Sequence, residues 1–306
     1  MPDPEQQSDS VLPSVEEAAT LVPGPESITW RISGDARILA TAGYALMLQV
    51  AHPTVGAGVA EHSNFRQDPW GRLFRTLDYT TIMVYGGHEL AAETGRRVRN
   101  MHKHIKGTLP GGDSYYALEP TAYAWVHATL ADAIVTGHHH FGLRLNRGQI
   151  EAFYAEWRRL GRLVGVRESE LPENWAAFRD YFDRMIDEEL VSNETVHDVV
   201  ESLGAPAAPP LPLLGGRAWR VARLPAARIG RLATIGLLPP RLRDRLGLPW
   251  SRSQDLQLRA LAGASRRARP LMPETARNFG PNYLRWRRDA IARGEVASGS
   301  GTPVPA

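Results

Sequence analysis

The sequence predicts an all-α protein, built as a single large multi-helix domain with a small helical C-terminal cap. Apolar residues recur at helical spacing along most of the chain, and alternating strand patterns are scarce. Proline and glycine fall where one periodic stretch ends and the next begins. With 306 residues, of which 43% are hydrophobic, the chain has ample material for a buried core.

Start and stop signals mark the helices of the first half. A periodic run ends at His52–Pro53, where the proline opens the next helix at a favoured first-turn position. Asp68–Pro69 begins another helix as an N-cap would, and Gly86–Gly87 stops it. The sequence after this helical half, GTLPGGDS, is typical of a turn-rich loop. We expect helices over residues 38–49, 54–62, 68–85 and 89–105.

The second half continues in the same way. Pro120 opens a helix that runs through Leu130, and two amphipathic helices are expected over residues 146–163 and 172–190. After residue 216, short helical stretches are separated by prolines, which favours a cap of small helices.

Composition divides the chain into five segments. The segment APAAPPLPLLGG is the clearest internal boundary, either a linker or a strap across the main body. The segments are a disordered tail (1–25), a helical core (26–204), the proline-rich segment (205–216), a basic helical part packed on the core (217–293) and a disordered tail (294–306).

The composition excludes several kinds of site. Without cysteine there is no disulfide, cysteine zinc site, iron–sulfur cluster, thiolate-ligated haem or cysteine nucleophile. The acidic, polar opening lacks the features of a secretory signal, and the most apolar stretch, Ile38 to Ala51, is too short to span a bilayer. We therefore expect a cytoplasmic protein.

Basic residues gather between Arg217 and Arg293 and are almost all arginine. Such a surface could meet an anionic membrane peripherally, or could simply be a set of solvated helix faces. We expect no nucleic-acid function. The motifs HExxH, GxxxxGK[ST], GxSxG and GxGxxG are absent, so zinc-peptidase, phosphate-loop, hydrolase-elbow and dinucleotide sites are not indicated.

Because the chain has ten histidines and no cysteine, the imidazole side chains are the candidate metal ligands to consider. His102 and His104 are two residues apart, which on a helix turns them about 200° from one another, so they cannot share a metal ion. His102 lies nearer the apolar face, and His104 is flanked by lysines, so we expect His102 to face inward. An inward histidine can be a hydrogen-bonded core residue or a ligand. The run His138–His140 is interpreted as solvated.

Arg72, Arg75 and Thr76 have spacings of three and four, which place them on one helix face. Such a cluster is costly to bury unless it meets an anion, and haem propionates would match the planar fork of arginine. The alternative is an exposed basic face.

Several motifs, in order, resemble a known family. They are LQVAHPTVGAGVAEHSNFRQDPWGRLFRT, RRVRNMHKHIKGT, YYALEPTAYAWVHATL, YAEWRRLGRLVGV and GLLPPRLRDRLGLPW. Together they are similar to the bacterial branch of the MpaB and rubber-oxygenase catalytic domain, long catalogued as a domain of unknown function. The resemblance extends from about Trp30 to about residue 265.

This resemblance implies haem b bound through a histidine on an all-helical scaffold, with dioxygen cleaving carbon–carbon double bonds of isoprenoid chains. It makes His102 the proximal iron ligand and places Arg72, Arg75 and Thr76 beside the haem. In rubber oxygenases a lysine that can bind the iron stands where this chain has Arg75. A guanidinium has no lone pair to offer, so the distal position would be open, bound to water, or filled by His62 or His52.

The first hypothesis is therefore a haem b oxygenase that acts with dioxygen on a lipophilic, unsaturated small molecule such as a terpenoid, polyketide or lipid. Its expected catalytic residues are Glu61 as base or proton relay, His62 and Arg75. The second is a non-catalytic helical haem- or lipid-binding protein with peripheral membrane attachment. A third, which nothing in the spacing demands, is a non-haem metal site formed by His52, His62, His102 and His127.

Overall fold

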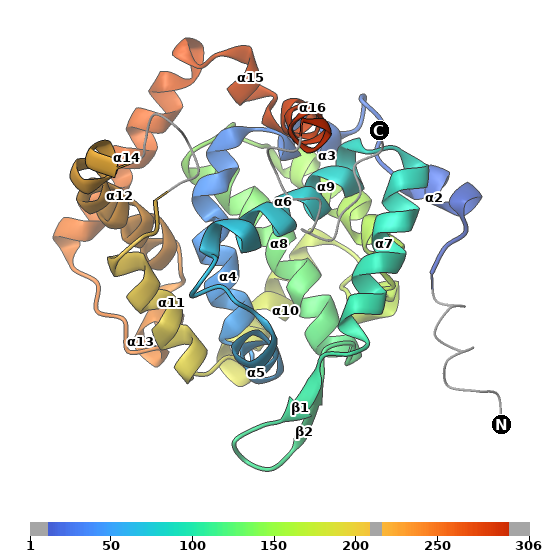
Figure 1. The fold of residues 1–306 in the computed structure, drawn as a ribbon, viewed down its shortest axis with the longest axis horizontal. Helices are drawn as coiled ribbons and strands as arrows, with labels where there is room; N and C mark the ends of the chain where they lie inside the picture. The colour runs from blue at the N-terminus through green and yellow to red at the C-terminus, as the bar shows by residue number, and fades with distance from the viewer. Residues whose placement is uncertain (1–11, 209–215, 294–306) are drawn as a thin grey trace.

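The computed structural model describes residues 12–208 and 216–293, which form helices apart from one short hairpin (Figure 1). The prediction of an all-α fold is confirmed. The 3-10 helices are η1 (Ala36–Thr41), η2 (Gly161–Val164), η3 (Glu168–Glu170) and η5 (Arg269–Leu271). The α-helices are α2 (Val15–Leu21), α3 (Ile28–Ser33), α4 (Ala42–Val50), α5 (Pro53–His62), α6 (Pro69–Tyr85), α7 (His88–His102), α8 (Pro120–His140), α9 (Arg147–Leu160), α10 (Trp175–Glu188), α11 (Glu194–Gly204), α12 (Gly216–Gly236), α13 (Pro240–Arg245), α14 (Arg252–Ala268), α15 (Glu274–Arg277) and α16 (Phe279–Ala292).

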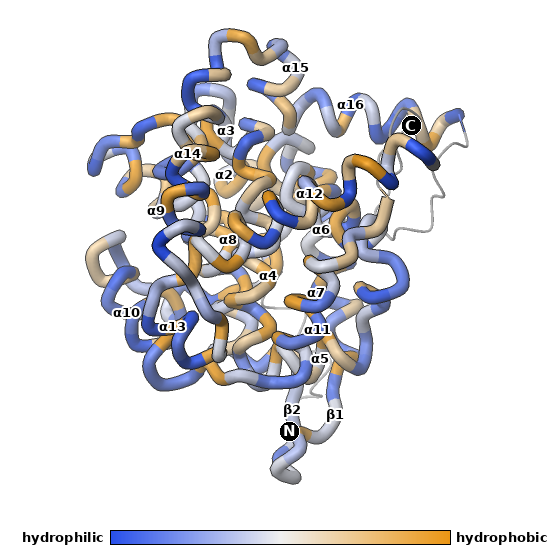
Figure 2. Tube along the Cα trace, turned by 90° about the vertical axis from the view of Figure 1, so that its left-hand side faces the viewer, coloured by the Kyte–Doolittle hydropathy of each residue, from blue (hydrophilic) through white to orange (hydrophobic). Residues whose placement is uncertain are grey.

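Helix α8 runs through the middle of the molecule, with η1, α4 and α9 packed against it (Figures 1 and 2). Small and apolar residues occupy almost every side of α8, as expected for a helix that is buried all round. The indole N–H of Trp125, which is fully buried, donates to the carbonyl oxygen of Leu48 on α4 at 3.0 Å. The hydrophobic core therefore forms around α8, and the other helices pack on this core.

The segment expected to be a turn-rich loop contains a β-hairpin. Strands β1 (Lys106–Thr108) and β2 (Ser114–Tyr116) pair antiparallel, with Lys106 opposite Tyr116. Gly112, in the connecting turn, has a φ of +94°, which favours glycine. Strands of three residues are too short to show an alternating pattern, and this explains why the sequence did not reveal them.

The N-terminal region differs from the expected tail of residues 1–25. Residues 1–11 lie outside the described residues, but α2 is an ordered helix. Ser14 and Glu17 form a capping box at its start, and Ala18 and Leu21 are buried where α2 packs against α7. The pattern Ser-x-x-Glu before apolar residues is itself a helix-start signal.

The C-terminal part lies against the core: α12 packs on α4 and α11, and α16 packs on α6. A buried ion pair joins α16 to α6, because Arg287 donates to both carboxylate oxygens of Asp78 at 2.9–3.1 Å. The Tyr283 hydroxyl donates to the same carboxylate at 2.6 Å. Residues 209–215, in the proline-rich segment, and the expected tail of residues 294–306 fall outside the described residues.

No single described helix is both long and apolar enough to cross a bilayer. The neighbouring segments Ala36–Val50 and Pro53–His62 meet that test only together, and they are bent by 107° where they join. Met47, Leu48 and Val50 of the first segment are fully buried in the core.

Candidate functional site

An apolar cavity of about 470 Å³ lies between α4, α6, α8, α11 and α12. Its lining is dominated by aliphatic side chains such as Leu46, Leu77 and Leu130. Polar residues of α6, among them Arg72 and Thr76, also line it. The volume falls in the range of small-molecule sites, roughly 300–1,000 Å³.

Arg72 is a half-buried cation without an acidic partner among the described residues. Its Nη1 donates to the Ser63 hydroxyl at 2.7 Å. Burial, and then the nearby charge of Arg75, lower the pKa of Arg72 to about 10. A cation that is desolvated and held only by a hydroxyl is well placed to receive an anion.

Of the three residues expected on one helix face, Arg72 and Thr76 line the cavity and Arg75 does not. Thr76 lies one turn after Arg72, is exposed to the cavity, and donates its hydroxyl proton to the Arg72 carbonyl oxygen at 3.1 Å. Arg75 instead donates to the side-chain oxygen of Asn64 at 2.8 Å and lies 3.7 Å from Asp68. Arg75 does not line the cavity, because the loop before α6 holds its side chain.

His102 is the last residue of α7 and is half-buried, whereas His104 beyond the helix end is exposed, so the expected contrast between the two is confirmed. The Nδ1 of His102 lies 2.7 Å from the Val98 carbonyl oxygen and donates to it. The ring is then protonated on Nδ1, and the lone pair is on Nε2, which has no partner among the described residues. The ring packs edge-on against Tyr123 with centroids 5.6 Å apart.

Electrostatics connect His102 to Arg72. Burial lowers the pKa of His102, and the charge of Arg72 lowers it further, while the hydrogen bond to Val98 opposes both effects. The imidazole is therefore neutral near pH 7, which is the form that binds metals. His102 does not line the apolar cavity, whereas Arg72, whose charge contributes to lowering the pKa of His102, does line it.

Glu61 and His62 lie together at the end of α5, beside the hairpin. Both side chains are substantially exposed, and the Nε2 of His62 is 3.8 Å from the Glu61 carboxylate. The hydroxyl of Tyr115, on β2, donates to that carboxylate at 2.7 Å. Neither residue lines the cavity.

Two further buried histidines, His127 and His138, have structural partners, whereas the buried Nδ1 of His52 has no hydrogen-bond partner among the described residues. The Nε2 of His127 donates to the Trp157 carbonyl oxygen at 2.8 Å, and burial lowers the pKa of His127 to about 4. His138 is fully buried between the Ile32 carbonyl and the Leu143 amide, so the interpretation of the run 138–140 as solvated is wrong at this position. Within the described ranges, no three His, Asp or Glu side chains are grouped so that they could hold a metal ion.

Two tyrosines near His102 were not predicted from the sequence. Tyr79 lies one turn after Thr76 on α6, and burial, with the neighbouring Tyr123, raises its pKa above the ordinary range. Tyr123 donates its hydroxyl proton to the Val164 carbonyl oxygen at 3.1 Å. The spacing of Arg72, Thr76 and Tyr79, one helical stripe, is the signal that could have identified Tyr79.

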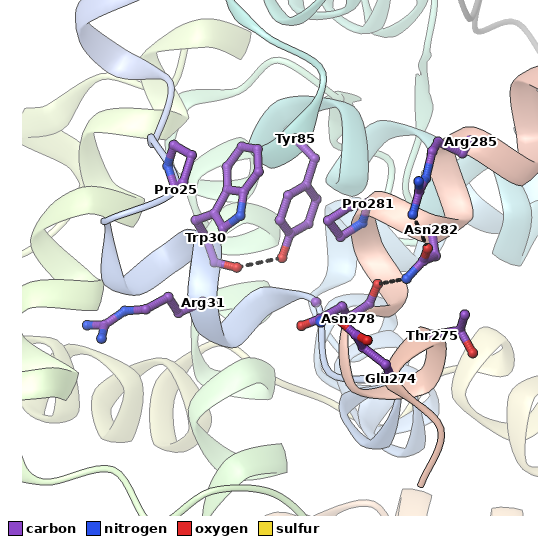
Figure 3. A pocket seen from close by; sticks show the side chains of 11 residues that line it. Pro25, Trp30, Arg31, Tyr85, Glu274, Thr275, Asn278, Pro281, Asn282 and Arg285 are labelled. Carbon is purple, nitrogen blue, oxygen red and sulfur yellow. Dashed lines mark hydrogen bonds between the residues drawn. The ribbon is translucent and has the colours of Figure 1, made fainter.

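A second hollow, of about 640 Å³, lies between α3, the end of α6, α15 and α16 (Figure 3). Some of its polar side chains are already bound to neighbouring backbone carbonyl groups. Tyr85 donates to the Trp30 carbonyl oxygen at 2.8 Å, and Asn282 donates to the Asn278 carbonyl oxygen at 2.8 Å. We therefore take the region of Arg72 and His102, with its apolar cavity, as the candidate functional site.

Comparison with known proteins identifies the family of the chain. The family model for the catalytic domain of ER-bound oxygenase mpaB/B′ and rubber oxygenase matches residues 30–267, which include every residue of the site. Uncharacterized protein Rv2237 of Mycobacterium tuberculosis and uncharacterized protein Mb2261 of Mycobacterium bovis are each 28% identical over 245 residues, covering 79% of this chain and 92% of theirs. No solved structure matches the chain. The chain belongs to the family of mpaB and rubber-oxygenase catalytic domains.

Proposed function

We propose that this protein is a haem b-dependent oxygenase that uses dioxygen to oxidise a lipophilic, unsaturated small molecule. The family supplies the oxygenase class. The observation that carries the haem assignment is the orientation of His102, whose Nδ1 is held by Val98 while Nε2 keeps its lone pair. A terpenoid, a polyketide or a lipid is the proposed substrate class.

The residues present fit haem b. Haem iron needs one protein nitrogen, and a ligating histidine normally donates its other ring N–H to a carbonyl or carboxylate, as His102 does. Arg72 has no carboxylate of its own and would bind a propionate. Thr76, one turn along, adds a hydroxyl beside it.

The substrate class is argued from the cavity wall. Leu46, Leu77 and Leu130 present aliphatic surface, and the acid in the lining, Asp35, is engaged by Arg37 at 2.5 Å. Against these aliphatic side chains a charged or strongly polar group would lose its hydration without compensation, whereas an apolar chain would gain by leaving water. This favours a lipophilic substrate.

Bound haem would supply the iron at which dioxygen reacts. His102 would hold the group through its free ring nitrogen, and Arg72 would bind one of its anionic substituents. Arg75 binds Asn64 and has no lone pair, so it does not take the place of a metal-binding lysine. Glu61 and His62 are proposed to move protons between the hairpin surface and the site.

A second candidate function is that of a non-catalytic carrier of haem or lipid. The observation in its favour is that Glu61 is exposed and bound to Tyr115, outside the cavity lining. No uncompensated acid lies in the described part of that lining. Haem binding without oxygen uptake, in the presence of unsaturated lipids or terpenoids, would establish this alternative.

The decisive experiment is the visible spectrum of purified protein, oxidised and then reduced, after reconstitution with haem b. We expect a Soret band at near-stoichiometric haem, lost in His102→Ala and retained in His104→Ala. His104 is the matched control because it is two residues away and exposed. A colourless protein, or loss of haem in the His104 variant alone, would overturn the assignment.

A further inference from the structure

Helix α12 has an outward face that is rich in arginine and contains no acid. Residues 216–236 include five arginines and neither aspartate nor glutamate. At about 100° per residue, two apolar side chains, Val221 and Leu224, fall on the same face as most of these arginines. Val221 is 79% exposed and Leu224 is 68% exposed. The arginines of this outer face are Arg217, Arg220, Arg228 and Arg231.

This composition is unusual for a face that meets only water. Elsewhere on the described surface several arginines pair with acids, as Arg97 does with Glu93 and Arg259 with Asp255. On α12, Arg228 makes its hydrogen bonds to Gln257 of α14, a neutral partner, at 2.9 and 3.2 Å. The outer face therefore keeps a concentrated positive charge with exposed aliphatic side chains between the guanidinium groups.

The opposite face of α12 forms part of the apolar cavity. Ala226, Ala227 and Gly230 line it, so the wall there is made of small residues on a single helix. Beside them, the indole N–H of Trp70 donates to the Ala207 carbonyl oxygen at 3.0 Å, at the edge of the same cavity. One helix, roughly 10 Å across, separates the cavity from the basic outer face.

We infer that the outer face of α12 binds the surface of a lipid bilayer that contains anionic lipids. The guanidinium groups lie at the depth of the lipid headgroups, and the methylene groups of the arginine side chains lie along apolar surface. Val221 and Leu224 enter the boundary between headgroups and acyl chains. Charge complementarity selects anionic lipids. If the proposed function holds, this attachment also brings the cavity next to the phase in which a lipophilic substrate is dissolved.

Exposed aliphatic side chains distinguish a bilayer from the other polyanion that such a face could meet. A nucleic acid would contact the arginines through phosphate, but its backbone offers nothing to Val221 or Leu224. A bilayer gains from both sets of residues. Substitution of Val221 and Leu224 therefore distinguishes binding to a bilayer from binding to a nucleic acid.

The test is flotation of the full-length protein with vesicles of phosphatidylcholine, alone or with about a third phosphatidylglycerol. We expect binding only with phosphatidylglycerol, weakened by salt. Arg217→Gln with Arg220→Gln should reduce partitioning roughly thirtyfold, because each arginine near an anionic surface contributes about fivefold. Val221→Glu with Leu224→Glu should abolish binding, since it removes the apolar contact and adds like charge to the lipid.

Two control variants match these changes elsewhere on the surface. Arg96→Gln with Arg147→Gln removes two exposed arginines from α7 and α9, and Val191→Glu alters an exposed valine between α10 and α11. Both should bind vesicles as the parent does. Equal binding to neutral and anionic vesicles, or equal losses in the control and α12 variants, would overturn the inference.

A duplex oligonucleotide that binds the protein, with loss in the arginine variant but not in Val221→Gln with Leu224→Gln, which removes the apolar contact without adding charge, would also overturn it in favour of nucleic acid. Flotation requires neither haem nor turnover. Failure of membrane binding and failure of the oxygenase assignment are therefore separate results.

Discussion

At the scale of single residues, Arg72 has the least favourable environment in the site. Its guanidinium has lost much of its hydration and is compensated only by the Ser63 hydroxyl. Removing such a charge from the protein without ligand should cost little, because no ion pair is broken. Arg72 is therefore expected to serve binding at the expense of stability.

We predict that Arg72→Met leaves the unfolding temperature of the haem-free protein unchanged or higher. It should weaken haem binding by roughly tenfold to a hundredfold, the contribution of a charge-assisted hydrogen bond. Haem titration followed at the Soret band and thermal unfolding measure the two effects. Arg75→Met is the control, since Arg75 bonds to exposed Asn64, and it should change haem affinity little. Equal losses of affinity in both variants would contradict this assignment of roles.

Spacing along a helix predicted the inward orientation of His102 correctly, because that orientation follows from the helix alone. The separation of Arg75 from Arg72 was not predictable, since it depends on how the loop containing Asn64 folds back. The bond from Tyr115 to Glu61 joins residues 54 positions apart and requires a hairpin that the sequence did not reveal. Contacts between distant segments are what a single sequence leaves undetermined.

At the scale of elements, the position of α7 depends on a close approach to η2. A Cβ at Gly95 would overlap the Leu163 carbonyl group, which is backbone and cannot turn aside. Glycine is therefore required there because the backbones touch. His102 lies two turns further along the same helix, so the approach at Gly95 also sets the place of the imidazole.

We predict that Gly95→Ala destabilises the protein by about 1–3 kcal/mol, the cost of overpacking, and weakens haem binding by displacing His102. Gly263→Ala in α14 is the matched control, because its Cβ would meet only the movable end of Arg267. That variant should be neutral or more stable by up to about 1 kcal/mol, owing to better helix propensity. Urea unfolding measures both, and destabilisation by the control alone would be incompatible with this account.

The helices with apolar stripes and clear caps were predictable because each signal is local to its own element. Among the missed elements, α2, α3 and the β1–β2 hairpin are short, but the 11-residue α11 was not predicted either. The polar composition around α2 outweighed its capping box, and strands of three residues carry no periodicity. The sequence therefore predicted the type of each element better than it predicted the packing that forms the site.

At the scale of the whole molecule, buried neutral histidines make the fold sensitive to acid. Burial lowers the pKa values of His52, His127 and His138, and that of His127 falls to about 4. A lowered pKa means that the unfolded chain binds a proton more readily than the folded one. The free energy of unfolding therefore decreases as the pH falls below the pKa of histidine in the unfolded chain, about 6.5. It levels off once the pH is below the pKa of the same histidine in the folded protein.

We predict that the protein loses stability between about pH 7.5 and pH 5, with about 2 kcal/mol of the loss due to His127. Urea unfolding across this interval, with His127→Gln for comparison, tests the contribution. The variant should be less stable at neutral pH because it disturbs the core, but its stability should depend less on pH. An unchanged pH dependence would exclude His127 as a source of the effect.

The ion pair between Asp78 and Arg287 also bears on the order of events during synthesis. The two residues are 209 positions apart. At about 5–20 residues per second, a ribosome needs roughly 10–40 seconds to pass from one to the other. Throughout that interval, the helix with Arg72 lacks the guanidinium that finally neutralises Asp78. If the proposed haem assignment holds, haem would therefore bind in the mature geometry only after nearly the whole chain has been translated, and a truncated nascent protein would present an unfinished site.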